Sequence, residues 1–285
     1  DLRFASKDLL NIIKSLQAKG VKVNHISNLI GQLNIKVYQK LYNLVLPVEL
    51  QKGACLIVMG SEGRNEQIIK TDQDNALVVK DGIDVEQYRP YMNEITKHLI
   101  DFGYPPCEGN IMVSNPSWCK TVSEYKNETK SWFEAPDMQH YMDLAIFFDS
   151  YAVAVDKALL INLKDDLFNK LHDKDVFMAY FAKATLTFDT PNTIANFMTK
   201  SHNIDIKKAA VFPIVQGIRS LALREKIRET TTVKRIKILE EKKILERSKA
   251  AELLEAFDVV NTLRLKAQLD DIQDNKEVNN EIDTH

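Results

Sequence analysis

The chain has 285 residues, a formal net charge of −2 and 45% hydrophobic residues. This length allows two domains of ordinary size, and the hydrophobic content is sufficient for packed cores. The nearly balanced charge argues against a basic surface for nucleic acid. The sequence contains no run of about twenty apolar residues, so it predicts no membrane-spanning helix.

The three cysteines, Cys55, Cys107 and Cys119, are an odd number and lack the paired spacing of zinc sites. We therefore expect free thiols and a cytoplasmic location, because disulfides persist mainly in oxidising compartments. No signal peptide is recognisable at the start of the chain. The first residue is Asp1 and not Met, so we expect a fragment of a longer protein.

The first 50 residues are predicted to be helical. Residues 6–19 carry apolar side chains on one face and end at Gly20. In residues 23–44 the apolar positions recur at alternating spacings of three and four, which is typical of a long amphipathic helix. A helix packed on its own domain is the favoured interpretation, and a coiled coil with a partner is the alternative.

The chain is organised around residues 56–79, LIVMGSEGRNEQIIKTDQDNALVV. The apolar run at 56–59 is too short for a helix and predicts a buried strand. A turn at Gly60 and Ser61 follows, and then a polar helical turn through Glu66 and Gln67. A second strand is predicted at 76–79.

Asp72 and Asp74 lie two residues apart at the start of this second strand. Side chains two apart on a strand point to the same face, so the two carboxylates should lie together. Carboxylate oxygens suit Mg²⁺, which usually binds one or two of them together with substrate phosphates. An EF-hand is a poorer alternative, because Leu77 and Ile83 would occupy its glycine and glutamate positions.

Small and cationic residues before this pair indicate a phosphate site. Gly60 has no Cβ, so its backbone can approach a phosphate closely. Ser61 offers a hydroxyl, and the Arg64 guanidinium can pair with a phosphate in a fork. A phosphate cradle and a metal-binding pair close together in sequence are typical of a nucleotide site.

The segment GSEGRNEQIIKTDQD resembles the signature of the nucleotidyltransferase superfamily with the polymerase-beta-like fold, which is Gly-Ser, a short helix and Asp-x-Asp. Its fuller form, with Arg64, Glu66, Gln67 and Thr71, is similar to bacterial nucleotidyltransferase-like proteins of signalling systems. In those proteins the nucleotidyltransferase-like domain often lies C-terminal to CBS or cyclic-nucleotide-binding modules. They are related to the uridylyltransferases that modify the PII nitrogen-regulatory protein.

A second segment resembles the same family through the pattern Cys-x-Gly-x-x-Met-x-x-Asn-Pro-x-Trp. The matching residues are Cys107, Gly109, Met112, Asn115, Pro116 and Trp118. By itself Asn115 would be a turn residue, but the resemblance implies that it lines the nucleotide pocket. Cys107 has no base nearby in sequence, so we assign it no nucleophilic role.

The resemblance implies an α+β fold in three parts. We expect an N-terminal helical segment at 1–50 and a nucleotidyltransferase core with a mixed sheet at 51–155. A C-terminal helical bundle at 156–285 would be the family's substrate-binding domain. In this last part we expect a helix at 176–188 with Phe181, Thr185 and Phe188 on one stripe. Arg219 and Arg224 are candidates for phosphate contact, although solvated helix arginines are commoner.

The superfamily also requires a third carboxylate on a later strand. Residues 142–153, MDLAIFFDSYAV, read as a strand with Asp143 and Asp149 on one face. The family usually shows an aromatic pair followed by Asp, so Asp149 is the expected third ligand and Asp143 the alternative. The family's Arg two places later is replaced here by Tyr151, which weakens the inferred substrate preference.

The implied activity is transfer of a nucleoside monophosphate from an NTP to a hydroxyl, with release of pyrophosphate. Two Mg²⁺ ions would be held by Asp72, Asp74 and Asp149, and Asp149 would also help to deprotonate the hydroxyl. Gly60 and Ser61 would hold the β and γ phosphates, with Arg64, Glu66 and Asn115 as further nucleotide contacts.

Kinship alone implies the acceptor and the partners. The acceptor would be a protein such as a PII-like regulator, and N-terminal regulatory modules would precede this fragment. We expect neither membrane nor nucleic acid as a partner. One alternative is a nucleotide-sensing module without turnover. Another is a helical interaction protein, or a homodimer, that uses residues 23–44 or 233–270.

Overall fold

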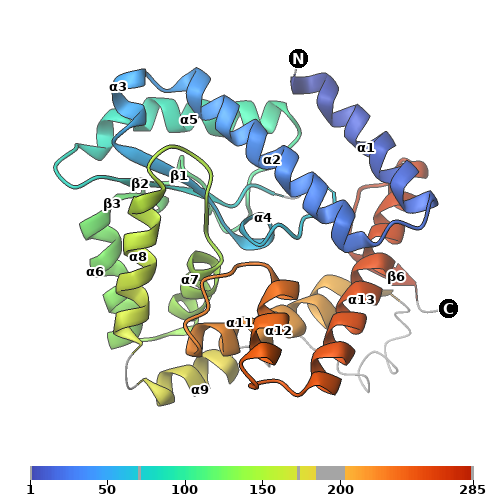
Figure 1. Cartoon of the computed structure of the whole chain (residues 1–285). Helices are drawn as coiled ribbons and strands as arrows, with labels where there is room; N and C mark the ends of the chain where they lie inside the picture. Colours follow the sequence, from blue (N-terminus) through green and yellow to red (C-terminus); the bar gives the residue numbers. More distant parts are fainter. Residues whose placement is uncertain (1, 70–71, 172–173, 184–202, 284–285) are drawn as a thin grey trace. The chain divides into compact units, whose positions relative to one another are not determined.

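The computed structural model describes residues 2–69, 72–171, 174–183 and 203–283 (Figure 1). It divides into two compact units. The first comprises residues 1–13 and 27–173, and the second comprises residues 14–26 and 174–285. None of the helices in the described ranges is long and apolar enough to cross a membrane.

The elements up to residue 171 include a small four-stranded sheet. In chain order they are α1 (Leu2–Ala18), α2 (Val23–Val45), α3 (Val48–Gln51), β1 (Ala54–Val58), α4 (Gly60–Gly63), β2 (Asn75–Val79), α5 (Arg89–Asp101), β3 (Cys119–Thr121), α6 (Val122–Glu134), α7 (Met138–Phe148), β4 (Tyr151–Ala152) and α8 (Lys157–Lys170).

The sheet is mixed, with the strand order β3-β2-β1-β4. β1 runs antiparallel to β2 and β4, whereas β2 runs parallel to β3. Every residue of β1 and β2 is buried. Such continuous apolar strands occur where helices cover both faces of a sheet. The predicted strands at 56–59 and 76–79 are therefore confirmed, with ends shifted by one or two residues.

Helices cover the sheet on both sides (Figure 1). On one side α2 and α5 pack on alternate residues of β1 and β2, which gives a core around Tyr38, Leu41, Leu56, Leu77 and Ile95. On the other side α8 packs against both strands and α6 packs against β2. The part of α2 in the first unit thus packs on its own domain through Tyr38, Leu41 and Tyr42, as the favoured interpretation predicted, whereas Leu33 and Leu44 of the predicted apolar face are exposed.

The strand predicted for residues 142–153 is largely wrong, because residues 138–148 form the helix α7. The Asp137 side chain caps this helix by accepting a hydrogen bond from the His140 amide at 2.8 Å. Phe147 packs against Tyr125 and Trp132 of α6, with ring centroids 5.5 and 5.8 Å apart. Strand structure begins only at Tyr151, where β4 pairs with β1.

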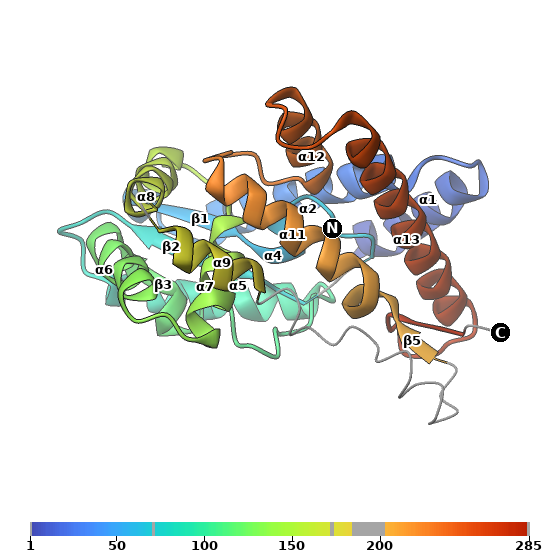
Figure 2. The same cartoon turned by 90° about the horizontal axis from the view of Figure 1, so that it is seen from below.

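The second unit is mainly helical (Figure 2). Its elements are α9 (Asp175–Lys183), β5 (Asn203–Asp205), a π-helical segment (Lys207–Val211), α11 (Phe212–Arg224), α12 (Thr232–Glu241), α13 (Arg247–Gln273) and β6 (Glu281–Asp283). α12 packs against α11 and α13. This confirms the C-terminal helical bundle.

Two further predictions for the C-terminal part have different outcomes. Phe181 is fully buried on α9, but Thr185 and Phe188 lie outside the described residues. We expected α8 to belong with the C-terminal helices, yet it packs on the sheet of the first unit. The boundary predicted at 155/156 stays a prediction, and the division by contacts falls after Asp173.

The cap of α7 offers a test of the helix against the strand. Asp137→Ala should lower the free energy of unfolding by about 1 kcal/mol, because the first turn loses its side-chain acceptor. Asp137→Asn, which keeps an acceptor, is the matched control and should cost less. Urea denaturation measures both. Equal stability of wild type and Asp137→Ala would contradict the helix.

Candidate functional site

Asp72 and Asp74 lie immediately before β2, with Gln73 between them. Gln73 is fully buried, and its side-chain amide donates to the Tyr104 carbonyl oxygen at 3.0 Å. Both aspartates, in contrast, are partly exposed. The two carboxylates therefore lie on one face of the extended chain. Ligand atoms of Asp72, Asp74 and Cys107 all lie within 4.8 Å of one another.

Gly60 lies directly against Asp74. The Met59 amide donates to the Asp74 carbonyl oxygen at 2.8 Å, which continues the pairing of Val58 with Asn75. A Cβ on Gly60 would lie 2.3 Å from Asp74 Oδ2, and the φ of Gly60 is +54°. Both the space and the backbone conformation thus require glycine.

The helical turn after Gly60 is α4, a single turn over Gly60–Gly63. The turn predicted through Glu66 and Gln67 is wrong, because Asn65 adopts a left-handed φ of +58° just after α4. The first amides of a helix have no acceptor within it. The amides at the start of α4, together with the partly exposed Ser61, therefore lie next to Asp74.

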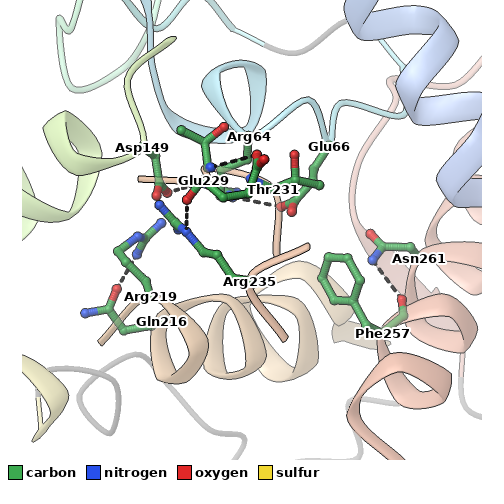
Figure 3. Close-up of polar contacts among 11 residues, drawn as sticks. Arg64, Glu66, Asp149, Gln216, Arg219, Glu229, Thr231, Arg235, Phe257 and Asn261 are labelled. Carbon is green, nitrogen blue, oxygen red and sulfur yellow. Dashed lines mark hydrogen bonds and ion pairs between the residues drawn. The ribbon is translucent and has the colours of Figure 1, made fainter. Parts of the chain in front are cut away.

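Arg64 follows α4 and is buried between two acids (Figure 3). Its Nε donates to Glu66 Oε2 and its Nη1 to Asp149 Oδ2, each at 2.8 Å. Burial alone would lower the pKa of Arg64, but Glu66 and Asp149 raise it above its ordinary value. The guanidinium stays charged, and the ion pairs connect α4 to the end of α7.

Asp149 caps the end of α7 and is fully buried. Among the described residues, the close group of metal-ligand atoms contains Asp72, Asp74 and Cys107, and Asp149 lies outside it. The alternative, Asp143, is on α7 and accepts a hydrogen bond from Gln139 at 2.9 Å. The role of Asp149 as a third metal ligand stays a prediction.

Asn115 shapes the loop before β3. Its Oδ1 accepts from the Ser117 amide at 3.0 Å and its Nδ2 donates to the Asn110 carbonyl oxygen at 2.9 Å. This is the turn role that the residue alone predicted. Its contact with a nucleotide stays a prediction.

Glu62 is a site residue that sequence reasoning missed. It lies in α4 and is 3% exposed. Burial raises the pKa of Glu62 to about 8; the nearby Tyr38 hydroxyl lowers it, and the charges of Asp74 and Asp72 raise it further. At neutral pH a large fraction of this carboxyl is therefore protonated. The only sequence signal for a role of Glu62 was its place directly after Gly60 and Ser61. The sequence does not reveal that Glu62 is buried.

A buried polar network lies beneath the site. Tyr104 Oη donates to Asn34 Oδ1 at 2.7 Å, and Asn34 Nδ2 donates to Gln67 Oε1. The Asn75 side chain donates to Tyr38 Oη at 3.4 Å. Asn34 and Tyr38 are one turn apart on α2, so this helix supports the site as well as the core. The sequence analysis did not single out Asn34, which lies next to the predicted apolar face of residues 23–44.

The second unit has its own buried arginines. Arg219 of α11 donates to the Gln216 side chain, and Arg235 of α12 donates to the Glu229 carbonyl oxygen (Figure 3). Arg224, the other sequence candidate, is exposed and lies beside Glu225. Of the two arginines that the sequence singled out, only Arg219 is buried.

Two family models match the chain. Residues 7–139 match "Putative nucleotidyltransferase DUF294", and residues 175–285 match "Putative nucleotidyltransferase substrate binding domain". The first range includes Gly60, Asp72, Asp74 and Cys107, whereas Asp149 lies between the two ranges. A search of curated proteins gave no match.

The ion pairs of Arg64 make a first prediction for the site. Arg64→Met should lower the free energy of unfolding by about 3–5 kcal/mol, because it leaves Glu66 and Asp149 buried without their cation. Asp149→Asn in the Arg64→Met background should restore part of this loss. Urea denaturation of the two single variants and the double variant measures the coupling. Strictly additive effects would show that the pair is not coupled.

Glu62 makes a second prediction, for pH dependence. Its folded pKa of about 8 exceeds the ordinary value of 4.5, so the native state binds this proton more tightly than the unfolded state. Stability contributed by this proton is present below pH 4.5 and is lost as the pH rises towards 8. Glu62→Gln should therefore gain stability over wild type at pH 8, by a few kcal/mol at most.

The measurement for Glu62 is urea denaturation of both proteins at pH 5 and pH 8. The gap between Glu62→Gln and wild type should widen towards pH 8. A gap that is constant over this range would mean that Glu62 titrates with its ordinary pKa.

Proposed function

We propose that this chain, whose two parts match the DUF294 domain and the associated substrate-binding domain, transfers a nucleoside monophosphate from an NTP to a hydroxyl acceptor. Pyrophosphate is the second product. The observation that carries this proposal is the close pair of aspartates, Asp72 and Asp74, of which Asp74 lies directly against Gly60.

Asp72 and Asp74 fit a divalent cation. Both carboxylates are partly exposed, and their oxygens lie within 4.8 Å of each other. Oxygen donors of this kind suit Mg²⁺. When bound, Mg²⁺ would neutralise charge on the triphosphate and on the entering and leaving oxygens. We further propose that two Mg²⁺ ions bind here, as the family resemblance implies.

Gly60 and Ser61 would orient the triphosphate. Gly60 has no side chain to cover its backbone, and both Gly60 and the neighbouring Ser61 are partly exposed. Amides at the start of α4 and the Ser61 hydroxyl are donors for phosphate oxygens. Donors fixed in place before the reaction stabilise charge in the transition state without reorganisation.

Arg64, Glu66 and Asp149 would hold the site together. We assign them a positioning role, because Arg64 at the end of α4 forms ion pairs with Glu66 and with Asp149 at the end of α7. Direct contact of Arg64, Glu66 or Asn115 with nucleotide, and of Asp149 with metal, remains a prediction from the family resemblance. Asp149→Asn would separate these roles, since loss of a metal ligand weakens cation binding and loss of an Arg64 partner lowers stability.

The acceptor is proposed from kinship. The resemblance to PII-modifying uridylyltransferases makes a protein hydroxyl the first acceptor class to test, with a PII-like regulator as the first example. The match to a substrate-binding domain at residues 175–285 supports binding of a substrate by the helical unit. A cytoplasmic signalling role with regulatory modules before this chain belongs to the same proposal.

One observation favours the second candidate, a nucleotide sensor without turnover. The group of ligand atoms described above contains two carboxylates and a thiol, and the Asp149 carboxylate pairs with Arg64. Such a site could bind a metal–nucleotide complex and still lack a third acidic ligand. Tight NTP binding in calorimetry without pyrophosphate release, across many acceptors, would support the sensor.

Pyrophosphate release tests the proposal. Purified protein with Mg²⁺, labelled NTPs and cell lysate should release pyrophosphate and label an acceptor. Asp72→Asn with Asp74→Asn should reduce the rate by about 100-fold or more, because the charge that holds the cation is lost. Asp101→Asn, on the exposed end of α5, is the matched control and should retain the wild-type rate.

The double variant must also keep its circular dichroism spectrum and its melting temperature. A folded double variant with the wild-type rate would contradict the assignment of Asp72 and Asp74.

A further inference from the structure

Cys107 lies beside the two aspartates, although sequence analysis gave it no role. Its sulfur lies within 4.8 Å of a carboxylate oxygen of Asp72 and of Asp74. Burial and the Asp74 charge raise the pKa of the Cys107 thiol to about 11. The thiol is therefore uncharged at neutral pH in the metal-free protein.

The loop around Cys107 is held against the start of β2. On one side the backbone amide of Gln73 donates to the Pro105 carbonyl oxygen at 3.0 Å. On the other side the Asn75 amide donates to the Ile111 carbonyl oxygen at 3.1 Å. These bonds flank Cys107 in sequence and come from the residues on either side of Asp74. Backbone pairing thus holds the loop that carries Cys107 beside Asp74.

The surroundings of this group favour a cation. Asp72, Asp74 and Cys107 are all partly exposed, so an ion can reach them from solvent. Glu62 is 97% buried, and within the described part of the chain neither of its carboxylate oxygens has a hydrogen bond of good geometry, although the Tyr38 hydroxyl lies nearby. Its carboxyl lies close enough to interact electrostatically with both aspartates. A cation bound between Asp72 and Asp74 reduces the repulsion between their two charges.

We propose that Cys107 is a third donor of this cation site, which makes it a mixed site of two carboxylates and one thiolate for thiophilic divalent cations such as Zn²⁺ or Cd²⁺. Mg²⁺ prefers oxygen ligands, whereas thiolates select softer metals. Three protein donors with a position open to solvent are typical of catalytic zinc sites. The thiol proton passes to solvent as the metal–sulfur bond forms.

The consequence for the protein is competition at one site. A thiophilic cation bound by Cys107 occupies the carboxylates that the proposed function assigns to Mg²⁺. The inference rests on that function only through its shared use of Asp72 and Asp74. Cation binding itself requires neither nucleotide nor turnover, so it can be measured separately.

Titration of the full chain with Cd²⁺, without nucleotide, tests the inference. Near-ultraviolet difference spectra should show a saturable thiolate-to-metal charge-transfer band at one equivalent. Cys107→Ser should lose this band, and Asp72→Asn with Asp74→Asn should weaken Cd²⁺ binding by at least about 10-fold. Cys119→Ala, which removes a buried cysteine outside the group, is the matched control and should keep the band.

A band that persists in Cys107→Ser, or no saturable band in the wild type, would overturn the inference. Failure here is distinguishable from failure of the proposed function. Pyrophosphate release that depends on Asp72 and Asp74, without a Cd²⁺ band, would leave the proposed function intact and remove the role of Cys107. Circular dichroism of Cys107→Ser confirms that the variant is folded.

Discussion

The close approach of Asp74 to Gly60 is the constraint on which the rest of the site depends. Antiparallel pairing of β1 with β2 brings residues 59 and 74 opposite each other, and the absence of a side chain at Gly60 leaves room for the carboxylate. The sheet that sets this register is buried on both faces. A local requirement for glycine and the global packing of the sheet thus specify one arrangement of charge.

Concentrating acids in a small volume is unfavourable unless their charge is compensated, and the fold does this in two ways. Glu66 and Asp149 share the Arg64 guanidinium, so the deeper acids are paired. Glu62 is kept largely protonated by burial at neutral pH. Asp72 and Asp74 remain partly exposed, with the Cys107 thiol as a neutral neighbour. The two carboxylates open to solvent are therefore the ones available to a cation.

Local patterns in the sequence predicted the parts of the site that neighbouring residues determine. The two short apolar strands and the common face of Asp72 and Asp74 follow from period-two geometry, which does not depend on distant contacts. The strand predicted at 142–153 was wrong because Asp137 caps a helix and Phe147 packs on α6, and neither effect is visible in an alternating pattern. The pairing of Arg64 with Asp149 joins residues 85 positions apart, so one sequence cannot reveal it. The burial of Glu62 likewise arises only from the packing of α2 and the sheet.

The central claim is that Asp72 and Asp74 hold a cation beside the Gly60 turn. Anomalous diffraction from crystals grown with Mn²⁺ and an unreactive NTP analogue tests this most directly, because it locates the metal without relying on activity. The account predicts an anomalous peak coordinated by both aspartates, with the triphosphate against Gly60 and Ser61. A metal peak and a triphosphate bound elsewhere in the first unit, with Asp72 and Asp74 left unliganded, would contradict it.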